Sequence, residues 1–211
     1  MSTKLRQQLI ETALAMNASG INQGMSGNLS IRMDGGFLIT PSGMNYSELT
    51  PEDIVAINLD GEWGGSIKPS SEWRFHRDIY RYRADAQAIL HAHPVYCSTL
   101  ACLGRPIPAF HYMVAVAGGR DIRCAAYATF GTQELSDEVL TALIDRKACL
   151  MANHGLLCLE RDLSRALALA IEIEHLAHVY HQCLAAGGPV IIGDEEMETI
   201  LEKYQHYGRK D

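Results

Sequence analysis

Apolar residues recur along this chain at two different spacings, which indicate two kinds of element. Near the N-terminus, Leu5, Leu9 and Ala13 follow the spacing of one helical face, and Gly20 ends the run. Elsewhere, short apolar runs alternate with polar residues between turn residues, as strands do. The pattern predicts helices over 3–19, 71–82, 96–103, 135–144, 163–186 and 195–204. It predicts strands over 29–33, 37–40, 54–59, 88–91, 148–151 and 156–159, with an irregular or short-stranded segment over 107–130.

The order of these elements predicts an α/β fold. Strands in adjacent hairpins with helices between them favour a sandwich around a mixed or antiparallel sheet, and disfavour a doubly wound nucleotide-binding fold. The length of 211 residues and the apolar content of 47% suit one compact domain over residues 1–211. No repeat, low-complexity stretch or linker marks a second domain.

Charge and composition narrow the possible partners and the location of the protein. The net charge of -7 argues against a nucleic-acid or anionic membrane surface, so a phosphate must be held by local geometry. No stretch of about twenty apolar residues is present to span a bilayer, and the N-terminus lacks the apolar core of a signal peptide. The 6 cysteines are scattered without a C-x-x-C pair, as reduced thiols are. We therefore expect a cytoplasmic protein.

Histidines and one glutamate lie at the ends of predicted elements. His91 and His93 stand two positions apart at the end of the strand 88–91, and alternate strand residues point to the same side, so both can hold one ion. His154 follows another apolar run, and Glu72 lies at the start of a predicted helix, where it can act as ligand or base. Three imidazoles, a carboxylate and an open coordination position are typical of a catalytic zinc site.

Three turns rich in glycine and hydroxyl residues indicate an anion site. Glycine lets backbone N–H groups approach a phosphate, and small hydroxyls add donors without charge. Each turn alone has the residues of an ordinary turn or helix cap. One of them, however, lies beside a predicted metal ligand, at a helix N-terminus that favours an anion. The three turns are Ser26-Gly27-Asn28, the segment 40–43 and Ser70-Ser71.

Two other groups offer alternative chemistry. His175, His178 and His181 lie on one predicted helix, but the outer two are about 240° apart around its axis, so all three cannot face one ion. We interpret them as a solvated or interface face. Lys68, near the serine pair, is able in principle to form a Schiff base, a route that the metal site makes unnecessary.

Several motifs occur in an order that resembles a known enzyme family. They are S-G-N-L-S, L-I-T-P-S-G, P-S-S-E-W-R-F-H, H-A-H, H-Y-M, Y-A-T-F-G-T, N-H-G-L and a terminal Y-x-x-Y-G. Over essentially the whole chain they resemble the class II, zinc-dependent sugar-phosphate aldolases, within the superfamily that includes ribulose-phosphate epimerases and the adducin head. The resemblance implies a single-domain three-layer sandwich with a central mixed, largely antiparallel sheet flanked by helices. It also implies one zinc ion per subunit and a homotetramer with fourfold symmetry, whose active sites lie between neighbouring subunits.

The resemblance also implies a role for each matching residue. His91, His93 and His154 match the zinc ligands, and Glu72 matches the acid/base that also ligates the metal when substrate is absent. Tyr112 matches a tyrosine that a neighbouring subunit supplies as proton donor to the aldehyde oxygen. The residues that match the phosphate site are Asn28, Ser42, Gly43, Ser70 and Ser71. The residues that match aromatics around the aldehyde half are Phe130 and Tyr207. Some relatives carry threonine in place of Ser42, which preserves the hydroxyl.

The reaction implied is reversible aldol cleavage of a ketose 1-phosphate, with L-fuculose 1-phosphate giving dihydroxyacetone phosphate and L-lactaldehyde. Glu72 handles the proton at C3 and Tyr112 the proton on the aldehyde oxygen. A glutamate in an apolar pocket near zinc can have its pKa moved into the working range, which we expect of Glu72.

Alternatives with the same chemistry are 5-deoxyribulose 1-phosphate and 5-methylthioribulose 1-phosphate, which yield the same dihydroxyacetone phosphate. Alternatives on the same scaffold are a ribulose-phosphate 4-epimerase, a methylthioribulose-phosphate dehydratase and a non-catalytic binding module. The presence of Glu72 and all three histidines disfavours the last of these.

Overall fold

One β-sheet organises the structure, a computed structural model in which residues 2–206 are described. Within that range seven strands pair in the order β3-β2-β1-β4-β7-β6-β5. Neighbouring strands are antiparallel except β5 and β6, which are parallel, so the sheet is mixed and largely antiparallel, as predicted. The strands are β1 (Asn28–Met33), β2 (Gly36–Ile39), β3 (Val55–Asn58), β4 (Ala88–Ala92), β5 (Arg123–Ala125), β6 (Ala148–Met151) and β7 (Gly155–Glu160).

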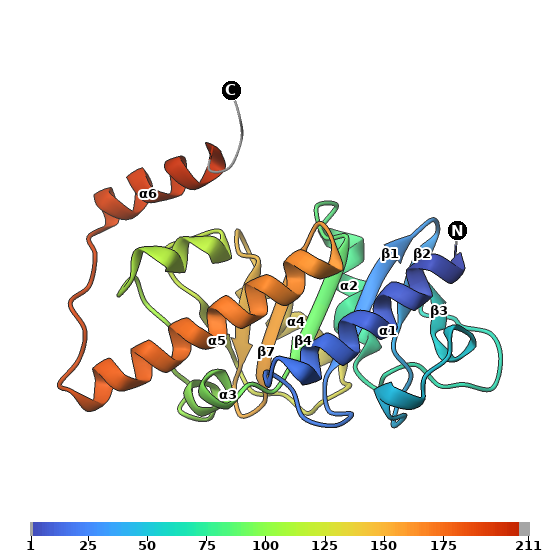
Figure 1. Cartoon of the computed structure of the whole chain (residues 1–211). Coiled ribbons are helices and arrows are strands. Elements are labelled where there is room, and N and C mark those ends of the chain that lie inside the picture. The colour runs from blue at the N-terminus through green and yellow to red at the C-terminus, as the bar shows by residue number, and fades with distance from the viewer. Residues whose placement is uncertain (1, 207–211) are drawn as a thin grey trace.

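Helices cover both faces of the sheet and make a three-layer sandwich (Figure 1). Alternate strand residues supply the two cores: Leu90 packs with α1, α3 and α5, whereas Ile89 packs with α2 and α4 on the opposite face. The helices are α1 (Ser2–Ala18), α2 (Trp73–Tyr82), α3 (Val95–Cys102), α4 (Gln133–Ala142), α5 (Leu163–Ala185) and α6 (Asp194–His206). Short 3-10 helices are η1 (Tyr46–Glu48), η2 (Pro51–Asp53) and η3 (Tyr112–Ala117).

The last helix, α6, lies away from the sheet and packs on η3 instead (Figure 1). Buried Met197 of α6 meets Ala109 and Ala115 there, in an apolar cluster separate from the two sheet cores. None of the described helices has both the length and the apolar character needed to cross a bilayer.

The predicted helices and strands are confirmed, with small shifts at their ends. The helix predicted over 71–82 begins at Trp73, because the Ser70 carbonyl accepts a hydrogen bond from the Trp73 N–H at 3.1 Å and closes a turn first. Ser70 and Ser71 therefore lie in the turn that precedes α2. β5 is a short strand within the segment 107–130, and the 3-10 helices had no signal in the apolar pattern.

Candidate metal centre

The centre is built on β4, in the middle of the sheet. His91 lies opposite Asn28 of β1 and Leu157 of β7, and its side chain is fully buried. Its Nδ1 is 2.9 Å from the carbonyl oxygen of Leu156. Because a carbonyl only accepts, Nδ1 carries the hydrogen in this contact, and the lone pair on Nε2 is left for an ion.

Two further imidazoles converge on His91. His93 lies one residue beyond the end of β4, and its Nε2 is 3.0 Å from Nε2 of His91, so the prediction that the two project together is confirmed. His154 lies in the turn between β6 and β7, next to Asn153 with φ 55°. The ligand nitrogens of the three histidines all lie within 4.8 Å of one another.

Gly155 allows this convergence. A Cβ at this position would lie 2.5 Å from the Ala92 carbonyl oxygen and 2.7 Å from Cδ2 of His93. Both distances are too short for any side chain, so β7 reaches β4 closely only because residue 155 is glycine. The motif N-H-G therefore supplies both a histidine and the space beside its partner.

Glu72 completes the group from the N-terminal end of α2. Its carboxylate is buried, with Oε2 3.2 Å from Nε2 of His91 and Oε1 3.3 Å from Nε2 of His154. Oε2 also accepts a hydrogen bond of 2.9 Å from Nδ2 of Asn28. Oε1 makes no hydrogen bond with any described residue. A buried carboxylate oxygen without a donor is an acceptor that a cation can satisfy.

Neighbouring side chains set the pKa of Glu72 in the protein without its metal. Burial raises the pKa of Glu72, but the neighbouring imidazoles, His91 first, and the Asn28 amide lower it to about 2. The pKa is low because His91 and His154 contact the carboxylate directly, which outweighs its burial. The expectation of a pKa in the working range concerns a glutamate beside zinc, and for the protein with its metal it stays a prediction.

The three imidazoles respond differently to the same surroundings. Burial, followed by repulsion from a protonated His91, lowers the pKa of His93 and of His154 to about 4. Burial also lowers the pKa of His91, but the Glu72 carboxylate more than offsets it, so the pKa of His91 is raised. Near neutral pH the site therefore holds two neutral imidazoles and one carboxylate. It also holds a third imidazole, which an incoming cation can deprotonate. This donor set fits one divalent ion of the zinc type.

The three turns predicted to hold an anion lie next to one another. An isolated antiparallel bridge joins Pro41 to Pro69, and the N–H of Ser42 donates to the Lys68 carbonyl while that of Ser70 donates to the Thr40 carbonyl. The segment 40–43 thus runs beside the serine turn. The N–H of Thr40 also donates to the carbonyl of Leu29, next to Asn28. Ser70 and Ser71 directly precede Glu72, and Gly43, with φ 69°, ends the neighbouring segment; the phosphate role of all three stays a prediction.

A cavity of about 340 Å³ opens beside the centre. Ser71, Glu72, His93 and His154 line it, as does Phe130, so the structure brings these predicted residues together. Tyr127 and Asn153, which we did not predict from the sequence, line the same cavity. Tyr127 stands three positions before Phe130 in the motif Y-A-T-F-G-T, and each side chain is 65% exposed. A second aromatic residue in the same motif as Phe130 was the sequence feature from which Tyr127 could have been predicted.

Two predicted residues are not brought to this cavity. Tyr112, in η3, lines a different cavity between η3 and α6, together with Met113 and Tyr204. Within one chain it is therefore away from Glu72, which leaves supply by a neighbouring subunit as a prediction. Tyr207 lies outside the described residues.

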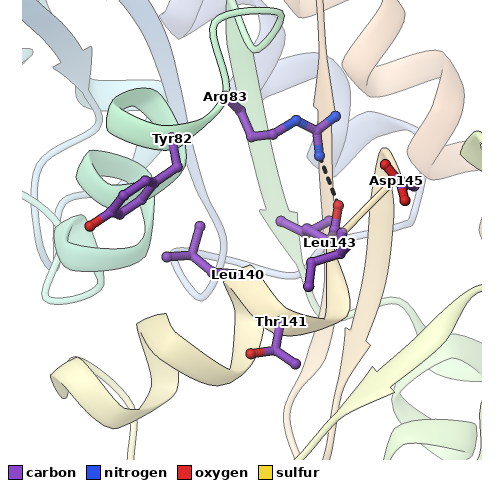
Figure 2. A pocket seen from close by; sticks show the side chains of 7 residues that line it. Tyr82, Arg83, Leu140, Thr141, Leu143 and Asp145 are labelled. Carbon is purple, nitrogen blue, oxygen red and sulfur yellow. Dashed lines mark hydrogen bonds between the residues drawn. The ribbon is translucent and has the colours of Figure 1, made fainter.

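Figure 2 shows a larger cavity, of about 530 Å³, which none of the predicted site residues lines. It is open between the ends of α2 and α4, where Tyr82, Leu140 and Ile144 contribute apolar surface. Its one guanidinium, Arg83, donates to the carbonyl oxygen of Leu143 at 2.8 Å and pairs with Asp85. The smaller cavity is lined by two imidazoles and a carboxylate, whereas the Arg83 guanidinium of the larger one is already paired, so the smaller cavity is the better functional site.

Within the part of the chain that the structure describes, the histidines of α5 are not gathered around one point as His91, His93 and His154 are. The ring of His178 stacks on Tyr96 of α3, with centroids 3.9 Å apart. The carboxylate of Glu174, one turn earlier on α5, accepts hydrogen bonds from the N–H groups of Tyr96 and Cys97. This side of α5 therefore fastens α3 to the fold.

Comparison with known proteins gives consistent matches over almost the whole chain. Residues 7–181 match the family described as "Class II Aldolase and Adducin N-terminal domain". A 5-methylthioribulose-1-phosphate/5-deoxyribulose-1-phosphate aldolase of Rhodospirillum rubrum is 54% identical over 97% of this chain and 92% of its own length. An L-fuculose phosphate aldolase of Escherichia coli K12 is 50% identical over 97% of this chain and 96% of its own length. A solved structure of an L-fuculose 1-phosphate aldolase superposes with a TM-score of 0.94 at 40% identity, over 97% of this chain and 98% of that one.

Proposed function

Since this chain belongs to the class II aldolase and adducin N-terminal domain family and is a class II aldolase, a carbon–carbon lyase, we propose that it cleaves a ketose 1-phosphate to dihydroxyacetone phosphate and a short aldehyde. The observation that carries the proposal is the convergence of three imidazoles and a buried carboxylate at one edge of a cavity. This is a set of groups that binds a divalent cation and moves a proton beside it.

We propose that His91, His93 and His154 hold one zinc ion per chain, with Glu72 as a further ligand when substrate is absent. The support is chemical: imidazole nitrogens are preferred zinc ligands, and Oε1 of Glu72 makes no hydrogen bond with any described residue. When bound, the ion supplies Lewis-acid stabilisation of negative charge on the substrate oxygens. The remaining steps fall to the side chains.

Glu72 moves the proton at C3 of the dihydroxyacetone phosphate half. Cleavage between C3 and C4 leaves a carbanion-like C3, which must receive a proton, and the reverse reaction must remove it. The carboxylate lines the cavity and is held at Oε2 by Asn28, so it is in place before substrate arrives. The phosphate is held by the adjacent turns, with Ser42, Gly43 and the serine pair before α2 as donors.

Tyr112 protonates, or deprotonates, the aldehyde oxygen from a neighbouring subunit. Its 52% exposed side chain lines a different cavity from the one that Glu72 lines, which supports its supply by a second chain. A homotetramer with active sites between subunits is therefore part of this proposal. Tyr207 completes the aldehyde region in the same proposal.

The aldehyde half is bounded by the aromatic rim formed by Tyr127 and Phe130. L-Fuculose 1-phosphate leaves an aldehyde with one hydroxyl and one methyl group, whereas the 5-deoxyribulose and 5-methylthioribulose 1-phosphates leave aldehydes without that hydroxyl. We propose L-fuculose 1-phosphate first. The 54% identical relative from Rhodospirillum rubrum supports the two pentulose phosphates as a second candidate.

The rate ratio between substrates tests this choice. Release of dihydroxyacetone phosphate is measured from L-fuculose 1-phosphate and from 5-deoxyribulose 1-phosphate by a coupled reductase assay. A site that hydrogen-bonds the extra hydroxyl rejects the substrate lacking it by a factor on the order of 10⁴, whereas an apolar pocket discriminates by about 10² or less. A strong preference for L-fuculose 1-phosphate supports the first candidate, and comparable rates support a pentulose-phosphate role. Release from neither, with bound metal, contradicts the aldolase proposal and favours the epimerase, dehydratase or binding-module alternatives.

A further inference from the structure

A row of polar side chains is buried between β1 and α2, directly behind Glu72. Asn28 and Ser30 stand two apart on β1 and therefore share the face that α2 covers, while His76 and Tyr80 stand four apart on α2 and face the sheet. Their side chains are at most 3% exposed. Apolar residues fill the rest of this interface, so four polar groups in one row need a reason.

The four residues form a continuous chain of short hydrogen bonds that ends at the carboxylate. The Tyr80 hydroxyl is 2.8 Å from Oγ of Ser30, and Oγ is 2.7 Å from Nδ1 of His76. Nε2 of His76 is 2.6 Å from Oδ1 of Asn28, whose Nδ2 is 2.9 Å from Oε2 of Glu72. Ser30, His76 and Asn28 therefore each have partners on both sides.

The carboxylate sets the direction of every donor in this chain. An ionised Glu72 only accepts, so Asn28 turns its NH₂ group to Oε2 and its Oδ1 to His76. Oδ1 also only accepts, so the hydrogen of the neutral imidazole lies on Nε2, and Nδ1 accepts from the Ser30 hydroxyl. Ser30 in turn accepts from the Tyr80 hydroxyl. Burial, the largest cause, lowers the pKa of His76 to about 3, so the imidazole is neutral as this pattern requires.

The imidazole is fixed from its flanks as well. Phe75 stacks on it with ring centroids 4.7 Å apart. At the far end, the guanidinium of Arg32 lies over the Tyr80 ring at 4.7 Å and donates to the Tyr80 and Arg83 carbonyl oxygens. The ring of His76 therefore has little freedom to rotate or to exchange its two nitrogens.

We infer that His76 is a positioning residue for Glu72: it fixes the amide of Asn28 so that this amide holds Oε2 and leaves Oε1, beside His154, as the carboxylate oxygen free of hydrogen bonds. The inference rests on the proposed role of Glu72 in moving the C3 proton. Without His76, the amide of Asn28 can turn by 180° and present Oδ1 to the carboxylate, which repels Glu72 from its place. Asn28 thus serves the acid/base residue, in addition to any contact of its second N–H with phosphate.

Proton exchange at C3 of dihydroxyacetone phosphate isolates this role. The wild-type enzyme with its metal is incubated with dihydroxyacetone phosphate in D₂O, without aldehyde, and replacement of one C3 hydrogen is followed by proton NMR. We expect His76→Phe to slow both this exchange and kcat by about 10- to 100-fold, with KM and metal content per chain unchanged. The matched variant His76→Gln should recover part of the rate, because its amide N–H can still donate to Asn28.

A substitution at Tyr80, the end of the row away from Glu72, tests whether loss of any buried polar group has the same effect. Tyr80→Phe removes a hydroxyl that is as deeply buried, but Ser30 keeps its own hydrogen for His76, so exchange should fall by about 3-fold or less. Ser30→Ala, which frees Nδ1 to take the hydrogen, should slow exchange more than Tyr80→Phe does.

Unchanged exchange in His76→Phe overturns the inference, as does a loss in Tyr80→Phe equal to that in His76→Phe. If His76→Phe does not fold, Ser30→Ala decides in the same way: slowed exchange at normal metal content supports the inference, and normal exchange overturns it. A wild-type enzyme that exchanges no C3 hydrogen contradicts the proposed function itself, which separates the two failures.

Discussion

At the scale of residues, Glu72 and His91 form the central pair. Their side chains are buried and 3.2 Å apart, so each stabilises the charge of the other in the protein without its metal. Oε1 of Glu72 lies near His154 and is unsatisfied among the described residues. The site is therefore arranged for a cation that replaces the proton of His91.

Removal of the carboxylate charge should separate metal binding from turnover. Glu72→Gln keeps the size of the side chain and leaves the three imidazoles in place, so we expect a folded protein with normal metal content. Its kcat should fall by about 10²- to 10⁴-fold, because the proton at C3 loses its base. Elemental analysis and the release of dihydroxyacetone phosphate measure both properties, and full activity in this variant would contradict the assigned role.

Metal binding to the metal-free protein should release a proton from His91. Glu72 raises the pKa of His91 above its ordinary value of 6.5, whereas His93 and His154, with pKa values lowered to about 4, are already neutral near pH 6.5. Ligands bind metal only when deprotonated. Proton release should thus be large at pH 6.5 and should shrink as the pH rises above the raised pKa of His91.

Calorimetric titration with metal in buffers of different ionisation enthalpy measures the protons released. Glu72→Gln is the control, because without the carboxylate His91 loses the group that raises its pKa, and release at pH 6.5 should be smaller. No release at pH 6.5 in the wild type would show that His91 is neutral before metal binds.

At the scale of elements, the sequence predicted most of the site because its ligands lie on regular structure. The period of two along β4 brought His91 and His93 to one side, as the short distance between their Nε2 atoms confirms. His154 was predicted from its position after an apolar run, not from any contact. What the pattern could not supply was the pairing of β1 with β4, which places Asn28 opposite His91.

The role of His76 likewise could not be predicted from the sequence pattern. In the sequence it is one of three polar residues in the stretch R-F-H-R, and nothing there indicates that it faces Asn28 and Ser30 of β1. Only packing of α2 on the sheet brings Ser30, 46 positions away, against its ring. Long-range contacts between polar residues are not encoded in local periodicity.

The position of α2 depends on a buried carboxylate that links it to α4. Asp78 accepts from Ser136 and Gln133, each at 2.7 Å, and pairs with Arg77. We expect Asp78→Ala to lower the free energy of unfolding by about 1–3 kcal/mol, since the buried Ser136 hydroxyl loses its acceptor. Urea unfolding measures the change, and the exposed Asp137→Ala should stay within about 0.5 kcal/mol of the wild type.

The effect of Asp78→Ala should also depend on pH. Burial raises the pKa of Asp78, but its hydrogen bonds, that from Arg77 first, lower it below the ordinary 3.8 overall. A carboxyl with a lowered pKa contributes stability above its unfolded-state pKa and loses it as the pH falls through the folded-state value. The difference between wild type and variant should be full above about pH 5 and shrink below pH 3.8. A constant difference across this range would mean that the charge of Asp78 does not matter.

At the scale of the whole molecule, the fold is confirmed and the assembly stays a prediction. The three-layer sandwich follows from the alternation of core residues on the two faces of the sheet. A homotetramer and a cytoplasmic location rest on the resemblance and on sequence composition. Within the chain, Tyr112 and Glu72 line different cavities.

Mixing two inactive variants tests whether the active site is shared. If Tyr112 acts on the Glu72 of a neighbouring chain, assemblies of Glu72→Gln and Tyr112→Phe chains contain some interfaces with both wild-type residues. For random equal mixing in a closed ring, about a quarter of the sites should be restored. Co-expression with two affinity tags and an aldolase assay measures this fraction, and mixtures no more active than the separate variants would place both residues in one chain.

The central claim is that the three histidines and Glu72 form the metal centre of an aldolase. The most direct test removes metal with a chelator and returns zinc in increments, while dihydroxyacetone phosphate release from a ketose 1-phosphate is measured. We predict that activity is lost with the metal and rises in proportion to added zinc until about one ion per chain is bound. Full activity in protein shown by elemental analysis to be free of metal would contradict the claim.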